Sequence, residues 1–300
     1  MQITPHYISA SDGTRLRTAV IAPASATRGA CVLLSGQTEF IEKYDEIIGE
    51  LNTRGFAVAT FDWRGQGGSD RLLPNRLKAH VGDFAQYDDD LASFMVQVVK
   101  PLSPSPPLAL AHSMGGHILL RALHRDPALV SSAAFSAPMI AFSARGFPTW
   151  LARGLTGLEN LAGQSKQFAL GMAARDPFLI TFDTQLVTTD RARFAHAQDF
   201  LKNHPDLRLA GPTWGWLAAA YRSVSAMQAP GYAEAITTPV LLCGAGHDRI
   251  VDTAATREFA SRLPHCTYLD LVDAEHEILM ETDSIRARFW AAFDAFAHAR

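Results

Sequence analysis

Short apolar runs alternate along most of the chain with longer segments that carry apolar residues at helical spacing. The runs fall at 31–35, 57–62, 108–112, 131–137, 239–246 and 266–272. Strands that helices cover on both faces are apolar along their whole length, so these runs are typical of a parallel sheet. Helices are expected at 41–54, 83–100, 253–263 and 283–300. The pattern predicts an α/β fold with a mostly parallel central sheet flanked by helices.

Two parts of the chain depart from this alternation. Residues 6–23 predict two antiparallel strands around a Ser-Asp-Gly turn, because glycine supplies the positive φ of a tight reversal. From 139 to 230 helical segments rich in aromatic residues appear instead, among them an expected helix at 213–227. We predict a helical lid, or cap, at 139–230, inserted into one α/β core that comprises residues 1–138 and 231–300.

The composition suits one large domain and excludes several classes of protein. The chain has 300 residues, of which 48% are hydrophobic, and a formal net charge of −3. That charge cannot neutralise a row of phosphates, so nucleic-acid binding is excluded. Three cysteines form no CxxC pair and are expected to be reduced and buried: Cys31, Cys243 and Cys266. Neither a secretory signal nor an apolar run of roughly 18 residues is visible, which predicts a soluble, cytoplasmic protein.

Ser113 lies between an apolar run and a helical segment, in the sequence LALAHSMGGHILL. Ala111 and Gly115 flank it two positions away, and a sharp strand-to-helix turn requires such small neighbours. We predict that Ser113 is a nucleophile held on this turn. The alternative is an ordinary helix start with Ser113 as the N-cap. His112 is expected to pack on the opposite side of the strand.

A serine hydroxyl is a weak nucleophile until a base takes its proton, so a histidine must reach the same edge of the sheet. Asp248 and His276 each lie in a loop that follows a predicted strand, and this topology uses the order serine, acid, histidine. We therefore predict His276 as the general base and Asp248 as the acid that orients it. The remaining Asp and His residues considered are weaker candidates: Asp252, Asp270, Asp273, His117, His247 and His265.

The oxygen of a tetrahedral intermediate needs hydrogen-bond donors, each worth about 3 kcal/mol. The backbone N–H groups of Met114 and Gln37 are the candidates for this oxyanion hole. Gln37 follows the first parallel strand, and Gly36 allows the main chain to approach the site. An ordinary glycine turn is the alternative.

These motifs resemble those of the monoacylglycerol lipase and bacterial lysophospholipase branch of the α/β hydrolases. SGQTEFIEKY at 35–44 is similar to the family's His-Gly-x-x-Glu…Tyr segment, and FDWRGQGGSD at 61–70 to its Asp-x-x-Gly-x-Gly-x-Ser loop. AHSMGG at 111–116 resembles its serine turn, while RLLPNRLKAHVGDFAQYDDDL and AGPTWGWL resemble the lysophospholipase members in particular. Ser35 stands in place of the family's histidine, and Ala111 in place of a glycine.

The resemblance implies an α/β-hydrolase fold with a lid, and an enzyme that hydrolyses carboxylic esters of acyl chains, such as a monoacylglycerol or a lysophospholipid. It places Ser113, Asp248 and His276 at the family's catalytic triad. Neither a metal ion nor an organic cofactor is expected.

The predicted lid carries enough aromatic side chains to line an apolar tunnel. The candidates for substrate contact are Phe142, Phe147, Trp214 and Trp216. Trp214 and Trp216 are two positions apart on an expected helix, so one should pack in the core while the other touches substrate. Residues 139–230 hold nine Lys and Arg against six Asp and Glu, a net charge of +3. That charge suits an anionic head group or peripheral contact with the inner membrane surface through the lid.

Other functions remain open, because one serine turn serves several reactions. An esterase, lactonase or thioesterase for small acyl compounds is the main alternative, and an aminopeptidase uses the same triad. Dehalogenase and epoxide hydrolase chemistry is disfavoured, since Ser113 occupies the position where those enzymes carry an aspartate. A ligand-binding protein of the same fold would have no chemical need for all three triad groups. Acyl length, head group and oligomeric state stay open.

Overall fold

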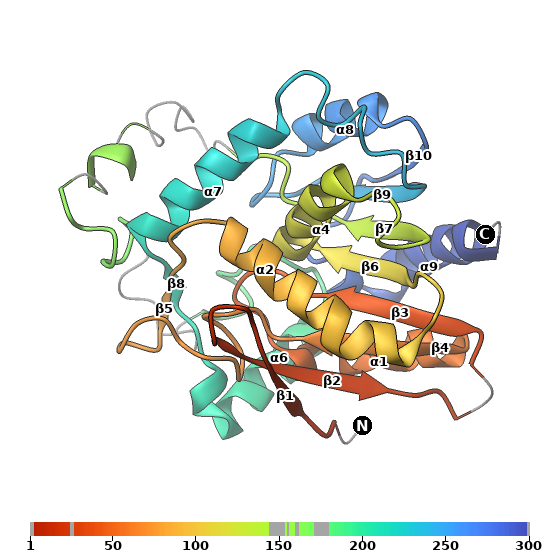
Figure 1. The fold of residues 1–300 in the computed structure, drawn as a ribbon, viewed down its shortest axis with the longest axis horizontal. Helices are drawn as coiled ribbons and strands as arrows, with labels where there is room; N and C mark the ends of the chain where they lie inside the picture. The colour runs from red at the N-terminus through yellow and green to blue at the C-terminus, as the bar shows by residue number, and fades with distance from the viewer. Residues whose placement is uncertain are drawn as a thin grey trace.

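The centre of the molecule is an eight-stranded sheet with the order β1-β2-β4-β3-β6-β7-β9-β10 (Figure 1). The computed structural model describes residues 3–24, 27–143, 154, 156–159, 162–170 and 180–298. The strands are β1 (His6–Ser9), β2 (Arg15–Ile21), β3 (Gly29–Leu34), β4 (Phe56–Phe61), β6 (Leu108–His112), β7 (Ser132–Ser136), β9 (Val240–Ala245) and β10 (Cys266–Leu271). β2 pairs antiparallel with β1 and β4, and every neighbouring pair from β4 to β10 is parallel. The predicted, mostly parallel sheet is confirmed.

Helices flank the sheet on both faces, as predicted (Figure 1). They are α1 (Asp45–Thr53), α2 (Ala85–Phe94), α3 (Lys100–Leu102), α4 (Ser113–Arg125), α8 (Thr253–Arg262) and α9 (Asp283–His298). α1 and α9 share the rear face in Figure 1, and α2 and α4 lie on the front face. The expected helix at 41–54 begins with a 3-10 turn over Ile41–Tyr44, and the expected helix at 83–100 contains a π-helical turn over Met95–Val99. Apolar periodicity does not distinguish these tighter and wider turns from an α-helix.

The described part of the 139–230 segment contains two longer helices. They are α6 (Arg191–Asn203) and α7 (Trp214–Met227), with a 3-10 turn (Pro205–Leu207) and β8 (Gly211–Pro212) between them. Asp190 caps α6 and Thr213 caps α7 through their side-chain oxygens, so α7 begins where the sequence predicted it. β8 pairs in parallel with β5 (Lys78–Ala79), a contact that the sequence did not predict. No helix within the described ranges is long and apolar enough to cross a bilayer.

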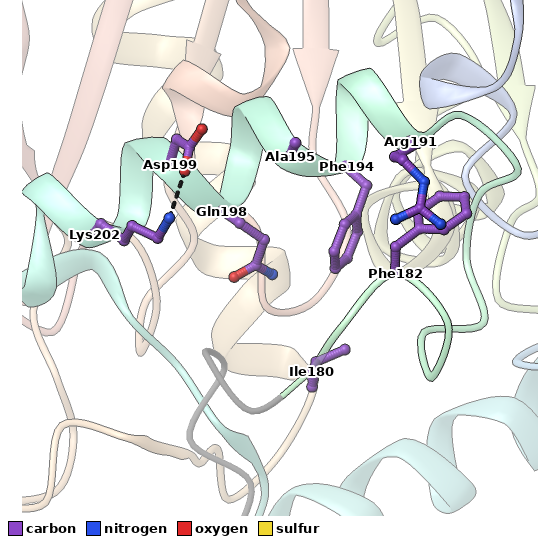
Figure 2. Close-up of a pocket in the computed structure, with 8 residues that line it drawn as sticks. All are labelled: Ile180, Phe182, Arg191, Phe194, Ala195, Gln198, Asp199 and Lys202. Carbon is purple, nitrogen blue, oxygen red and sulfur yellow. Dashed lines mark hydrogen bonds and ion pairs between the residues drawn. The ribbon is translucent and has the colours of Figure 1, made fainter.

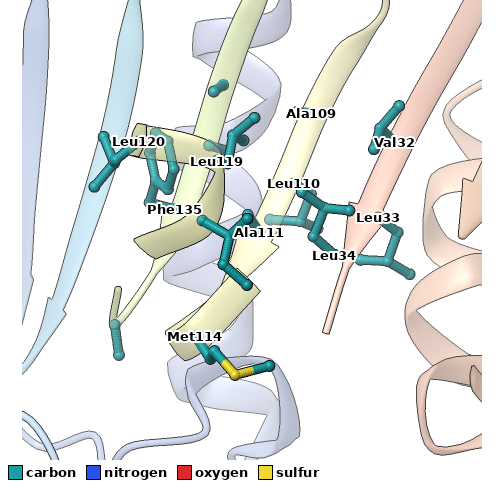
Figure 3. Packing of buried hydrophobic residues seen from close by; sticks show 14 of the residues in the cluster. Val32, Leu33, Leu34, Ala109, Leu110, Ala111, Met114, Leu119, Leu120 and Phe135 are labelled. Carbon is teal, nitrogen blue, oxygen red and sulfur yellow. The ribbon is translucent and has the colours of Figure 1, made fainter. Parts of the chain in front are cut away.

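Part of the hydrophobic core lies where β3, β6 and β7 meet α4 (Figure 3). Leu34 and Ala111 are partners across β3 and β6, and both are fully buried. Met114, also fully buried, extends from the first turn of α4 into this core. Burial of each large apolar side chain contributes about 1.5–3 kcal/mol. The strand end and the helix start at Ser113 are therefore supported by a dense apolar framework.

α4 approaches the end of β3 so closely that only glycine fits at position 115. A Cβ on Gly115 would lie 2.5 Å from the carbonyl oxygen of Ser35 and 2.8 Å from that of Leu34. Both oxygens belong to the backbone and cannot move aside as the end of a flexible side chain can. The glycine therefore sets the distance between β3 and the helix that carries Ser113.

Gly115→Ala is expected to lower the free energy of unfolding by about 1–3 kcal/mol, the usual cost of overpacking a core. Gly49→Ala is the matched control, because Gly49 lies in α1 and a Cβ there would meet no atom within 4 Å. This control is expected to gain about 0.5–1 kcal/mol from helix propensity. Urea unfolding of both variants tests the difference, and equal effects would contradict the close approach.

Candidate active site

Ser113 is the first residue of α4 and follows β6 directly, with a backbone φ of +48°. A residue other than glycine pays about 1–3 kcal/mol for this left-handed conformation, so its surroundings must hold it there. Gly36 and Gly116 allow this close packing, since a Cβ on Gly36 would lie 3.2 Å from the Ser113 Cβ. His112 is the N-cap residue of α4, which contradicts the alternative in which Ser113 is the cap.

Ser113, His276 and Asp248 form a continuous chain of hydrogen bonds. His276 Nε2 lies 2.9 Å from Ser113 Oγ, and His276 Nδ1 lies 2.7 Å from Asp248 Oδ2. A carboxylate can only accept, so Nδ1 carries the proton and Nε2 offers its lone pair to the serine hydroxyl. Asp248 Oδ1 accepts bonds from the backbone N–H groups of Ile250 and Val251, at 2.7 and 2.9 Å, which fix the acid. The carboxyl ends of three parallel strands, β6, β9 and β10, thus bring the three side chains together.

The weaker acid and histidine candidates have other partners. Asp252 caps α8 by accepting bonds from two backbone N–H groups. Asp270 pairs with Arg257, and Asp273 pairs with Arg288. His112 Nδ1 lies 2.9 Å from the carbonyl oxygen of Ser136. His117 Nε2 lies 2.6 Å from the Ser223 hydroxyl, and its Nδ1 lies 2.7 Å from the carbonyl oxygen of Met139. None of these hydrogen bonds involves His276, although the rings of His112 and His276 lie beside each other, with centroids 4.9 Å apart.

The environment of His276 favours its protonated form. Burial by itself lowers the pKa of the imidazole, but the charge and hydrogen bond of Asp248, with smaller contributions from Glu277 and Glu39, raise it above 6.5. The adjacent His112 is also buried, and burial lowers its pKa to about 4, so it stays neutral beside His276. The acid therefore stabilises the cation that forms when His276 accepts a proton.

The loop after β3 lies beside Ser113 and is fixed by buried side chains. The Glu39 carboxylate accepts hydrogen bonds from the backbone N–H of Gly36 and, at 2.6 Å, from the hydroxyl of Tyr44. Gln66 donates to the carbonyl oxygen of Gly36 at 2.8 Å and accepts from the backbone N–H of Thr38 at 3.2 Å. Gln37, the expected oxyanion residue, lies between these anchored positions. The sequence had not assigned Glu39 or Gln66 a role, although both lie in the motifs that carry the family resemblance.

Lys43 joins this loop to the loop of His276. Its Nζ lies 2.7 Å from Glu39 Oε1 and 2.6 Å from Glu277 Oε1. All three side chains are largely buried. Burial alone would raise the pKa of Glu39, but the charge of Lys43 holds it well below its usual range. An ion pair of this kind is strong because little water screens it.

The four candidates for substrate contact differ in their surroundings. Trp216 donates from Nε1 to the hydroxyl of Tyr87 at 3.1 Å, so it packs between α7 and α2 and is the core member of the tryptophan pair. Trp214 is 8% exposed. Phe142 forms a bridge with Val251, in the loop of Asp248. Phe147 lies outside the described residues.

Two cavities border α6, and no triad residue lines either of them. The first, of about 290 Å³, lies between Ile180, Phe182 and Phe194, with the Arg191 guanidinium over the ring of Phe182 (Figure 2). The second, of about 430 Å³, lies between α6 and residues 43–46, with Lys43 among its lining residues. Across the part of the chain that the structure describes, no three His, Cys, Asp or Glu side chains converge to hold a metal ion.

The parallel sheet and the serine on a strand-to-helix turn define the class of the α/β hydrolases. Residues 25–283 match the family described as "Serine aminopeptidase, S33", and the chain belongs to this family.

Lysophospholipase L2 of Escherichia coli is 32% identical over 265 residues, which cover 85% of this chain and 76% of that protein. A probable lysophospholipase L2 of Haemophilus influenzae is 26% identical over 300 residues, which cover 100% of this chain and 93% of that protein. Among solved structures, a soluble variant of monoglyceride lipase from Saccharomyces cerevisiae superposes with a TM-score of 0.74 at 20% identity, covering 99% of this chain and 96% of that one. The last of these shares the fold of this chain along nearly its whole length.

The His276 imidazole is expected to titrate above pH 6.5, because Asp248 outweighs the effect of burial. In Asp248→Asn the negative charge is gone while burial remains, so the pKa of His276 should fall below that of the unmodified protein. NMR titration of the His276 ring in both proteins measures the shift. A higher pKa in the variant would contradict the electrostatic role of Asp248.

Proposed function

We propose that this protein is a serine hydrolase that cleaves carboxylic esters of acyl chains, of the lysophospholipase or monoacylglycerol lipase type. The observation that carries the proposal is the chain of hydrogen bonds from Ser113 through His276 to Asp248. Membership of the S33 family supports a hydrolase, and the lysophospholipase relatives support a lipid ester as substrate.

In the proposed mechanism His276 Nε2 takes the proton of Ser113 as Oγ attacks the ester carbonyl carbon. The resulting oxyanion accepts hydrogen bonds from the backbone N–H groups of Gln37 and Met114. The imidazolium, stabilised by Asp248, then gives its proton to the alkoxide leaving group, and an acyl ester remains on Ser113. Water, activated by the same imidazole, attacks that ester and releases the fatty acid.

The 139–230 segment is proposed to act as a lid that forms the acyl site. Phe142 supports this role because its bridge with Val251 brings it next to the loop of the acid. Trp214 is the other proposed substrate contact, since Trp216 is engaged with α2. Phe147 is proposed on its sequence position alone. The net charge of +3 in this segment fits an anionic head group or peripheral contact with an anionic membrane surface.

Hydrolysis of small esters, lactones or thioesters is the second candidate. Its supporting observation is the burial of the site, because Ser113 is 7% exposed and His276 is 5% exposed. A small ester needs less displacement of the covering residues than a lysolipid does. The two candidates share the mechanism and differ in the preferred length of the acyl chain.

Ser113→Ala is expected to abolish ester hydrolysis and labelling by a fluorophosphonate probe. Its melting temperature should stay near that of the unmodified protein, because only the attacking oxygen is lost.

Asp248→Asn should lower kcat by about four orders of magnitude by leaving the histidine in the wrong tautomer. Asp252→Asn is the matched control, since Asn also caps a helix well, and it should keep full turnover. Undiminished hydrolysis by Ser113→Ala would refute the nucleophile.

Specificity constants are expected to rise with acyl length if the lid forms an acyl tunnel. Each buried methylene can add up to about 0.8 kcal/mol to transition-state binding. Trp214→Ala should flatten this rise, whereas Trp216→Ala should mainly lower stability. Measuring kcat/KM for esters of two, four, eight and twelve carbons in all three proteins is the test. An optimum at two carbons with a steady decline afterwards would favour the small-ester candidate.

A further inference from the structure

The carboxylate of Glu281 is fully buried close to the loop that carries His276. Its Oε1 accepts a hydrogen bond from the backbone N–H of Glu275 at 2.8 Å. Its Oε2 accepts two bonds from Thr189, one from the backbone N–H at 3.1 Å and one from the hydroxyl. Glu275 directly precedes His276, whereas Thr189 belongs to the 139–230 segment. One buried carboxylate therefore ties the loop of the base to a distant part of the chain.

Two further hydrogen bonds join the same two segments. The backbone N–H of Glu277 donates to the carbonyl of Val187 at 2.7 Å. The hydroxyl of Thr188 donates to the carbonyl of Met280, also at 2.7 Å. The residues on both sides of His276 are thus bonded, directly or through Glu281, to residues 187–189.

Arg193 anchors this contact to the core. Its guanidinium donates to the carbonyl oxygen of Glu281 and to Asp190 Oδ2, both at 2.9 Å, and to Glu46 Oε2 at 2.8 Å. Glu46 lies on α1, and the hydrogen bond from Arg193 is the main reason why its pKa falls to about 2. The start of α6 is therefore attached both to the loop of His276 and to α1.

We propose that Glu281 is a positioning residue for His276, and that residues 187–189 complete a clamp on the loop of the base. The inference rests on the proposed function. Hydrogen bonds to a buried carboxylate are about twice as strong as neutral ones, so this clamp is stiff. In this view the 139–230 segment does more than cover substrate, because its 187–193 end holds the catalytic base.

Glu281→Gln tests the clamp with little change in volume. An amide has one oxygen that accepts and one nitrogen that only donates. Whichever way the new amide is turned, its nitrogen therefore faces a donor of Thr189 or of Glu275 in place of an acceptor. We expect kcat to fall by about 10- to 100-fold, as a displacement of the base by up to about 1 Å would produce. The KM for a soluble two-carbon ester should stay within about twofold, and the loss should be equal for two- and eight-carbon esters, because the base serves both. Turnover is expressed per serine labelled by the fluorophosphonate probe, which removes any unfolded fraction from the comparison.

Asp283→Asn is the matched control, because Asp283 also contacts Arg193 but its side chain is 90% exposed. It should keep full turnover per labelled serine. If Glu281→Gln does not fold, the pair Thr189→Val and Thr189→Ser carries the test. Valine removes the hydroxyl donor and should lower kcat, and serine, which restores it, should recover kcat. Unchanged turnover in Glu281→Gln, or equal turnover in the two Thr189 variants, would overturn the clamp. Residual turnover in Ser113→Ala would instead overturn the proposed function.

Discussion

The left-handed backbone at Ser113 is the constraint on which the site depends. It reverses the chain from β6 into α4 within one residue, so the serine side chain and the first N–H groups of the helix lie at the same end of the sheet. This conformation costs about 1–3 kcal/mol, and the surrounding core has to outweigh that cost. Gly36 and Gly115 contribute by letting the β3 loop and α4 approach without side chains between them. The position of the Ser113 hydroxyl thus depends on the apolar packing around the strand-to-helix turn.

The other parts of the site are held by buried polar contacts rather than by the backbone. Lys43 connects the loop after β3 with the residue that follows His276, and Glu281 connects the residue that precedes it with the 139–230 segment. Each contact is largely buried, so each is stronger than a counterpart on the open surface. Losing one partner would leave a charge or donor buried without compensation, which is why such networks tolerate little change.

Much of the fold could be predicted from the sequence, because apolar runs and helical spacing are local signals. The run at 108–112 coincides with β6, and the helix expected at 213–227 coincides with α7 to within one residue. Local chemistry also separated Asp248 from Asp252, since only the latter directly precedes a helix that needs a cap. Contacts between distant polar residues left no such signal. Nothing in the sequence pairs Gln66 with Gly36 or Glu281 with Thr189, and the two-residue strands β5 and β8 are too short to alternate. Helical spacing showed that Trp214 and Trp216 face apart but not which of them packs against α2.

The hydrogen bond between Ser113 and His276 joins residues that are 163 positions apart, and β7, β9 and β10 must all be in register before it can form. Contacts of such high sequence separation close a large loop and form slowly. In a refolding chain the imidazole can therefore reach the hydroxyl only after these strands have paired. Under the proposed function, recovery of turnover during refolding would report the pairing of the last two strands.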